Sequence, residues 1–108
     1  MEIKEAQKKV DETIKQYGGY WESLSMMARL TEEVGELARA LNLKYGGKRS
    51  KFDGDGREIE DELADVLYTA LAIANKEGID MAEIFIRKMT QSHNKYKEVY
   101  QGEKEWQS

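Results

Sequence analysis

The stretch LTEEVGELARAL, residues 30–41, combines a helical pattern of apolar side chains with three glutamates. A residue in a helix turns by about 100°. This rotation puts four apolar side chains on one stripe that we expect to face a core: Leu30, Val34, Leu37 and Leu41. By the same rotation Glu33 and Glu36 flank the stripe, whereas Glu32 points farther toward solvent. Two carboxylates are therefore predicted at the edge of a buried face.

The segment from about residue 58 to 76 repeats this arrangement. Its apolar face consists of six residues: Ile59, Leu63, Val66, Leu67, Ala70 and Ala74. Glu62 and Asp65 share a neighbouring strip, because residues three apart lie on one face of a helix. If the two helices pack side by side, four carboxylates converge: Glu33, Glu36, Glu62 and Asp65. They would repel one another strongly in a partly dry groove, and a hard cation such as Mg²⁺, which takes oxygen ligands, would remove that repulsion.

A glutamate-rich helix face is more often a solvated surface, supported by pairs four residues apart. Three features favour a site here. Gly35 lies in mid-helix between Glu33 and Glu36, where glycine costs about 1 kcal/mol relative to alanine, so we expect another helix or a ligand to approach closely. The run VLYTALAIA, residues 66–74, is apolar on nearly all sides, which indicates burial. Finally, both segments carry acids three residues apart.

Glycine divides a chain without proline into four segments, none of which alternates like a strand. We predict four helices, at about residues 3–16, 23–43, 58–76 and 80–99. Ser23 and Asp80 are the predicted N-caps of the second and fourth helices, and Gly78 is the predicted C-terminal signal of the third.

These segments predict an all-α four-helix bundle in a single domain, residues 1–108. We expect a mobile loop at 46–56 and a frayed tail at 102–108. In the third helix, Tyr68 and Ala72 lie off the main apolar stripe. They indicate a second buried face, which we attribute to a subunit interface, so that oligomerisation completes the bundle.

The composition excludes several kinds of site and partner. Without cysteine there is no disulfide or thiolate site, and a single histidine, His93, cannot supply a di-iron bundle or a multi-histidine zinc site. The 17 basic and 21 acidic residues give a formal charge of −4, which argues against a nucleic-acid partner. No apolar run approaches the ~18 residues of a membrane span. The charged N-terminus also lacks a signal-peptide pattern, so we expect no membrane partner and a cytoplasmic location.

Three further groups of residues each have two interpretations. Tyr20 and Trp21 follow a Gly-Gly turn and either stack on a nucleobase or cap the core of the bundle. Lys48 and Lys51 belong to a basic loop that either closes over phosphates or is simply solvated. Lys95 either reaches a phosphate or covers a helix surface.

The two acidic segments together resemble the MazG-type nucleotide pyrophosphohydrolases. That family carries EExxE followed, after a variable loop, by ExxD, and this chain reads Glu32-Glu33-x-x-Glu36 and Glu62-x-x-Asp65. The resemblance covers roughly residues 15–100 and is to the short, single-domain bacterial branch. It implies an all-α enzyme that works as a dimer or tetramer. Such an enzyme hydrolyses nucleoside or deoxynucleoside triphosphates to the monophosphate and pyrophosphate, with Mg²⁺, or Mn²⁺ in its place.

The resemblance also implies roles for the acids. Four of them would be the metal ligands: Glu33, Glu36, Glu62 and Asp65. Glu32 would help to orient water, and Glu33 or Glu36 would take the proton of the water that attacks phosphorus.

For the substrate, the resemblance implies that Tyr20 and Trp21 hold the base. Lys95 and Tyr96 fall where relatives often carry a basic residue and a tyrosine. That basic residue is commonly arginine, and a lysine supplies a point charge in place of a bidentate contact. Lys95, with Lys48 or Lys51, would offset the charge that grows on the leaving pyrophosphate.

Two other classes of function fit the same residues. One is a non-catalytic helical oligomerisation module, in which the acids are solvated or hold a structural metal. The other is a nucleotide sensor that binds without turnover. Substitution of the acids separates these hypotheses, because only an enzyme has turnover to lose while it keeps its fold.

Overall fold

The computed structural model describes residues 1–46 and 58–100. It contains four helices: α1 (Ile3–Gln16), α2 (Ser23–Tyr45), α3 (Ile59–Lys76) and α4 (Met81–Val99). No strand occurs in these two ranges, so the predicted all-α fold of four helices is confirmed. Each helix begins and ends within two residues of the predicted position. The predicted loop, apart from Gly46, and the predicted tail lie outside the described residues.

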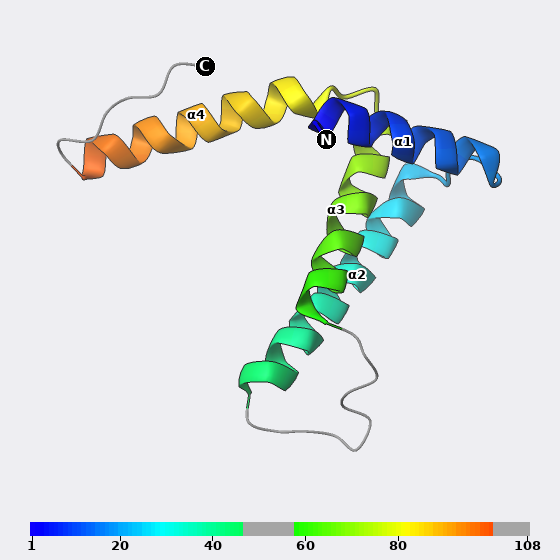
Figure 1. Cartoon of the computed structure of the whole chain (residues 1–108), viewed down its shortest axis with the longest axis horizontal. Helices are drawn as coiled ribbons and strands as arrows, with labels where there is room; N and C mark the ends of the chain where they lie inside the picture. The colour runs from blue at the N-terminus through cyan, green and yellow to red at the C-terminus, as the bar shows by residue number, and fades with distance from the viewer. Residues whose placement is uncertain (47–57, 101–108) are drawn as a thin grey trace.

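The helices α2 and α3 form a long antiparallel hairpin, and α1 crosses one end of it (Figure 1). From that same end α4 projects away as an arm that packs against α1. The radius of gyration is 17.6 Å, whereas a compact chain of this length has a value of about 13 Å. The chain alone is therefore open, and α4 has little of its own fold to pack on.

Local signals fix the ends of the helices around the α3–α4 turn. Gly78 adopts φ +70°, a left-handed conformation that glycine reaches without a steric penalty, and it ends α3 as predicted. Asp80 caps α4, because its side chain accepts a hydrogen bond of 3.1 Å from the backbone of Ala82.

The prediction that Ser23 is the N-cap of α2 is wrong: the N-cap is Glu22, which makes no capping hydrogen bond through its side chain. The Ser23 hydroxyl instead donates to Glu77, the C-cap residue of α3, at 2.5 Å.

The core lies where α1 meets α3. Val10 of α1 packs there with Leu71 and Ala72 of α3. Ala72 is thus buried within its own chain, and the prediction that it belongs to a subunit interface is wrong. Beside this core the buried Gln7 side chain donates to Ile79 at 2.9 Å and accepts from the backbone of Met81 at 2.9 Å. One polar side chain therefore fixes α1 against the start of α4.

The seam between α2 and α3 departs from the predicted apolar stripe, of which Leu30 and Leu37 are only partly buried. The buried residues of α2 recur every seven positions, at Met26, Glu33 and Ala40, so the face turned toward α3 carries a carboxylate. Four predicted core residues expose between 41 and 60% of their surface: Val34, Leu41, Leu63 and Leu67. The hairpin thus buries acids and leaves a substantial apolar surface uncovered.

The expected close approach at Gly35 is also not found. A Cβ built at this position meets no atom within 4 Å among the residues described. Within residues 1–46 and 58–100 of one chain, no helix packs closely enough against Gly35 to require glycine there.

None of the four helices, as far as the chain is described, is long and apolar enough to span a membrane.

Candidate functional site

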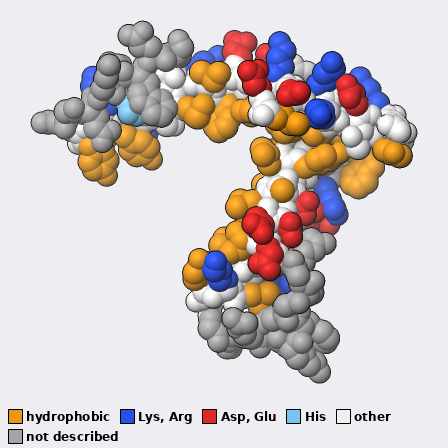
Figure 2. Space-filling model, in the orientation of Figure 1, with side chains coloured by type: hydrophobic (Ala, Val, Ile, Leu, Met, Phe, Trp, Pro, Cys, Tyr) orange, Lys and Arg blue, Asp and Glu red, His pale blue; other side chains and the backbone are white. Residues whose placement is uncertain are grey.

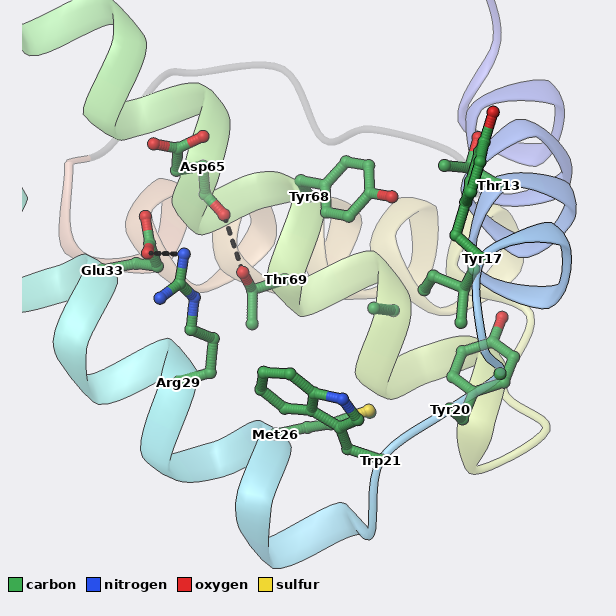
Figure 3. Close-up of a pocket in the computed structure, with 13 residues that line it drawn as sticks. Thr13, Tyr17, Tyr20, Trp21, Met26, Arg29, Glu33, Asp65, Tyr68 and Thr69 are labelled. Atoms are coloured by element: carbon green, nitrogen blue, oxygen red, sulfur yellow. Dashed lines mark hydrogen bonds and ion pairs between the residues drawn. The ribbon is translucent and has the colours of Figure 1, made fainter.

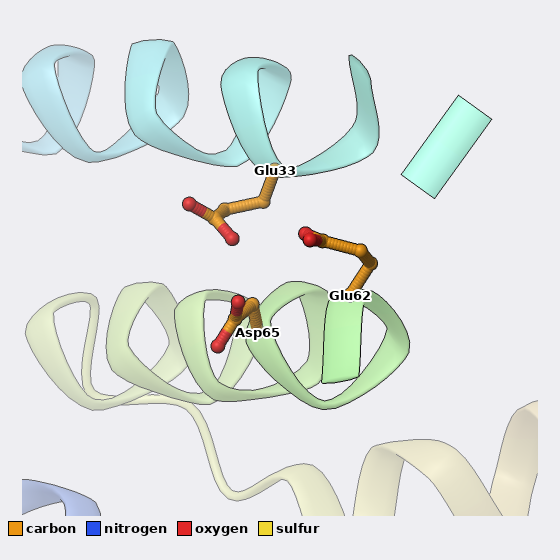
Figure 4. Close-up of side chains that lie close together, drawn as sticks. All are labelled: Glu33, Glu62 and Asp65. Carbon is orange, nitrogen blue, oxygen red and sulfur yellow. The ribbon is translucent and has the colours of Figure 1, made fainter. Parts of the chain in front are cut away.

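Three carboxylates face one another across the seam of the α2–α3 hairpin (Figure 4). Glu33 comes from α2, and Glu62 and Asp65 come from α3; one oxygen of each lies within 4.8 Å of the others. We call these three residues the acid cluster. Glu62 is 1% exposed and Glu33 5% exposed, and Asp65 is partly buried. The predicted convergence of acids from two helices is therefore present for these three residues.

Burial and mutual repulsion make the acid cluster electrostatically costly. Burial raises the pKa of the Glu33 carboxyl above its ordinary value, and the charges of Asp65 and Glu62 raise it further. Arg29 opposes this effect and lowers the pKa, because its Nη2 lies 3.0 Å from Oε1 of Glu33. Acidic side chains gather on the same face of the hairpin (Figure 2). Positive charge beside such a group lowers the energy of its ionised form.

The donor set of the acid cluster fits a hard divalent cation. Its three side chains offer only carboxylate oxygens, which are the ligands that Mg²⁺ prefers. Oxygens bound to one Mg²⁺ lie roughly 3 to 4 Å apart. Small side-chain movements within the present arrangement would therefore bring the three oxygens to a shared ion.

A cavity of about 490 Å³ opens beside the acid cluster (Figure 3). Glu33 and Asp65 line one end. The rest of the lining is rich in aromatic side chains from the α1–α2 connection and α3: Tyr17, Tyr20, Trp21 and Tyr68. We call this cavity the aromatic pocket. The aromatic part of this pocket suits a flat ring, and the end lined by Glu33 and Asp65 suits a cation.

The two predicted base-binding residues differ in how firmly they are held. The Tyr20 hydroxyl donates to Asp11 of α1 at 2.5 Å. Burial and this bond raise the pKa of Tyr20 to about 12, and the bond lowers the pKa of Asp11. Trp21, in contrast, is 60% exposed, although it lines the aromatic pocket. Tyr20 forms part of the fixed wall, and Trp21 has a face open to a ligand.

Other predicted residues lie away from the acid cluster. Glu36 and Glu32 are exposed on α2 and are not among the three clustered acids. Lys95 and Tyr96 are exposed near the far end of α4, on the arm that points away from the hairpin.

Lys48 and Lys51 lie outside the residues that the structure describes. Their predicted contact with phosphate therefore stays a prediction.

The structure adds three residues that the sequence did not indicate as part of a site. Arg29 and Thr69 line the aromatic pocket next to the acid cluster, and Tyr68 lines it farther along α3. Arg29 is four residues before Glu33, a spacing typical of ordinary solvated ion pairs. The hydrophobic pattern of α3 assigned Tyr68 to an interface. Only the packing of α2 on α3 shows that these side chains share a cavity.

Comparison with known proteins supports an enzymatic interpretation of this geometry. A family model, the MazG nucleotide pyrophosphohydrolase domain, matches residues 22–97 and so includes both acidic segments. The protein YpjD of Bacillus subtilis strain 168 is 44% identical over 88 residues, which cover 81% of this chain and 79% of YpjD.

Solved structures share the fold. The crystal structure of YpjD from Bacillus subtilis has a TM-score of 0.74 and 42% identity, over 84% of this chain and 94% of that one. A Bacillus-conserved MazG protein, a nucleotide pyrophosphohydrolase, gives a TM-score of 0.70 at 41% identity, over 84% of this chain and 88% of that one. The crystal structure of iMazG from Vibrio DAT 722 has a TM-score of 0.63 and 27% identity, over 86% of this chain and 99% of that one.

Proposed function

This chain belongs to the MazG nucleotide pyrophosphohydrolase family, and we propose that it hydrolyses nucleoside and deoxynucleoside triphosphates to the monophosphate and pyrophosphate. Membership makes it a hydrolase that acts on nucleotides. The proposal adds the triphosphate as substrate, cleavage between the α and β phosphorus atoms, and Mg²⁺ as cofactor, with Mn²⁺ able to replace it. We place this reaction in the cytoplasm, as a means of cleaning the nucleotide pool.

One observation carries the proposal: the aromatic pocket and the acid cluster are continuous. Glu33 and Asp65 belong to both. A nucleoside triphosphate has an aromatic ring at one end and a chain of anionic oxygens at the other. With its base among the aromatic side chains, its phosphates would extend toward the three carboxylates. That placement needs a cation, because phosphate and carboxylate oxygens repel each other.

We propose that Glu33, Glu62 and Asp65 hold Mg²⁺, and that Glu36 completes the set. Glu36 is three residues beyond Glu33 on neighbouring faces of α2, so a change of its side-chain rotamer would bring its carboxylate toward the cluster. When bound, Mg²⁺ supplies Lewis-acid polarisation of the phosphate oxygens. The protein contributes the fixed geometry, because both helices hold their acids in place before substrate arrives.

Among the acids, Glu33 is our choice for the general base. Its carboxylate is the one that α2 contributes to the acid cluster, and a carboxylate held in place beside a water molecule can accept its proton. Its position at the edge of the aromatic pocket gives it access to water beside the α-phosphate. Glu36 is the alternative base, and Glu32, one residue before Glu33 and more exposed, would orient the water.

At the other end of the pocket, Trp21 would stack on the base while Tyr20 forms the fixed wall behind it. Stacking between a base and an aromatic side chain contributes about 1–3 kcal/mol. The hydrogen bond from Tyr20 to Asp11 keeps that wall in place, because Asp11 belongs to α1 and Tyr20 to the following connection.

We further propose that the active form is a homo-oligomer, a dimer or a tetramer. Exposed apolar side chains lie along α2 and α3 and on a stripe of α4 that includes Phe85, Ile86 and Met89, and contiguous exposed apolar patches mark interaction surfaces. Packing α4 of one copy on the hairpin of another would cover both. In such an assembly, Lys95 and Tyr96 of one copy are our candidates for contact with the phosphates bound by the next, and Lys48 and Lys51 stay candidates for the same role.

The test is a product assay with a panel of standard and modified nucleoside triphosphates, each with Mg²⁺ and with excess chelator. We expect pyrophosphate without orthophosphate, only with Mg²⁺, and lost in D65N. The matched control is D61N, because Asp61 is an exposed acid four residues earlier on α3. Nucleotide binding without any product would indicate a sensor, and neither binding nor product would indicate a structural module. Either result would overturn the proposed function.

A further inference from the structure

Arg29 is the one cation that the structure brings to the acid cluster within the described ranges. Its guanidinium lies 3.0 Å from Glu33 and 3.6 Å from Glu32. It also lines the aromatic pocket, where it lies between Glu33 and the indole of Trp21 (Figure 3). Arg29 is thus both the counter-ion of a buried acid and part of the wall of the cavity.

The two partners of the Arg29–Glu33 ion pair lie in different environments. The Arg29 side chain is 52% exposed, whereas that of Glu33 is 7% exposed. Because the guanidinium is half-exposed, water already solvates part of it and would solvate the rest when it moves away. The order along α2, with the cation before the anion, is also the less favourable one for a helix. Arg29 can therefore leave Glu33 at little cost once another cation serves that carboxylate.

The position of Arg29 along the pocket indicates where it would go. Arg29 is four residues before Glu33, a distance of about 6 Å along the helix axis, and Trp21 precedes α2. A nucleotide with its base at Trp21 and its terminal phosphates at the acid cluster would place its sugar and α-phosphate beside Arg29. A guanidinium recognises phosphate oxygens through paired hydrogen bonds.

We propose that Arg29 is an exchanging counter-ion, which neutralises Glu33 in the empty site and moves to the α-phosphate when the divalent cation takes its place. This inference rests on the proposed function, because it names a residue of the same site. The exchange keeps a positive charge beside Glu33 at each stage. Arg29 offsets the charge of Glu33 before loading, the divalent cation offsets it afterwards, and the freed guanidinium meets the negative charge that the triphosphate brings. During hydrolysis it would stabilise the charge on the phosphoryl group under attack.

The first test measures Mn²⁺ affinity without nucleotide, by the loss of the free-ion signal in electron paramagnetic resonance. The variants are R29M and, as a matched control, R39M. Arg39 is exposed on the same helix, ten residues away, or about 15 Å along its axis. We expect R29M to bind Mn²⁺ roughly threefold more tightly, because a competing cation is gone, and R39M to bind it as the unchanged protein does.

The second test measures turnover of the preferred nucleotide with saturating Mg²⁺. We expect kcat of R29M to fall about 100-fold, as for loss of one donor to a developing charge, and R39M to keep its activity. R29K, which retains the charge, should restore near-normal Mn²⁺ affinity and part of kcat. It also serves as a folded comparison if R29M unfolds.

The combination of tighter metal binding and lost turnover is specific to an exchanging counter-ion. If R29M binds Mn²⁺ equally or more weakly, Arg29 only positions Glu33, and the proposal is overturned. If R29M keeps its kcat, Arg29 does not serve the phosphate, and the proposal is also overturned. If the unchanged protein binds no Mn²⁺ and releases no pyrophosphate, the proposed function itself fails.

Discussion

Replacing Glu62 by glutamine should stabilise the metal-free protein and abolish its stabilisation by Mg²⁺. Glu62 is the most deeply buried side chain of the acid cluster. The substitution keeps its size and removes one negative charge. It also adds an amide that can donate hydrogen bonds to the two carboxylates that remain.

The magnitude follows from the spacing of the acid cluster. Two unit charges 4.8 Å apart repel by about 3.5 kcal/mol at an effective dielectric constant of 20. Protonation of one carboxyl limits the repulsion that the protein sustains, and Arg29 offsets another part. We therefore expect the free energy of unfolding to rise by about 1–3 kcal/mol, or Tm by roughly 5–15 °C for a chain of this size.

The assay is thermal and urea unfolding, followed by circular dichroism, in excess chelator and in saturating Mg²⁺. In Mg²⁺ the unchanged protein should gain about 2.7 kcal/mol at 100 times the dissociation constant, whereas E62Q should gain little. E60Q is the matched control, because Glu60 is exposed on the same turn of α3, and its effect should stay within about 0.5 kcal/mol. The reasoning is refuted if E62Q is less stable than the unchanged protein in chelator, or if Mg²⁺ stabilises both equally.

Three further predictions test other parts of the structure. W21A should raise KM about 10- to 100-fold through lost stacking without changing the unfolding midpoint. The control L24A, at an exposed position outside the pocket, should leave KM unchanged. Equal effects of the two substitutions on KM would contradict the base-binding role of Trp21. G35A should raise Tm by a few degrees, through about 0.5–1 kcal/mol of helix propensity, and a lower Tm would place another subunit against this position. The raised pKa of Glu33 favours the folded state below the unfolded-state value of about 4.5. That contribution is lost as pH rises through the folded-state pKa. In urea titrations, the metal-free protein should therefore lose stability over this pH range relative to E33Q. Parallel curves of stability against pH for the two proteins would contradict the shift.

The sequence predicted the helices well because their limits depend on neighbouring residues. Gly78 supplies a left-handed backbone and Asp80 an N-cap, and both signals are readable from a few positions. Ser23 failed as a cap for the opposite reason. Its hydroxyl binds Glu77, a residue 54 positions away, and local patterns carry no information about such a partner.

The acid cluster was predicted in part. Spacing alone placed Glu62 and Asp65 on one face of α3, and Glu33 at the edge of the apolar stripe of α2. Periodicity could not say which of two faces α2 turns toward α3. The structure turns Met26, Glu33 and Ala40 inward. Two residues of the apolar stripe, Val34 and Leu41, are exposed instead, and so is Glu36.

The aromatic pocket could not be predicted from the sequence, because it forms where three helices meet. Tyr17 and Tyr20 come from one end of the chain and Tyr68 from α3, and no spacing rule relates them. By spacing alone, Arg29 and Glu33 form a common type of surface ion pair. Only the structure shows that Glu33 is buried and that Arg29 is the counter-ion of a buried carboxylate.

The most direct test of a cation site at the acid cluster is a crystal structure with Mn²⁺ and a non-hydrolysable nucleoside triphosphate, read from the anomalous scattering of manganese. The account predicts a peak at coordination distance from Glu33, Glu62 and Asp65, with the base against Trp21 and the phosphates on the ion. A peak elsewhere, or a nucleotide bound with no ion at these three carboxylates, would contradict it.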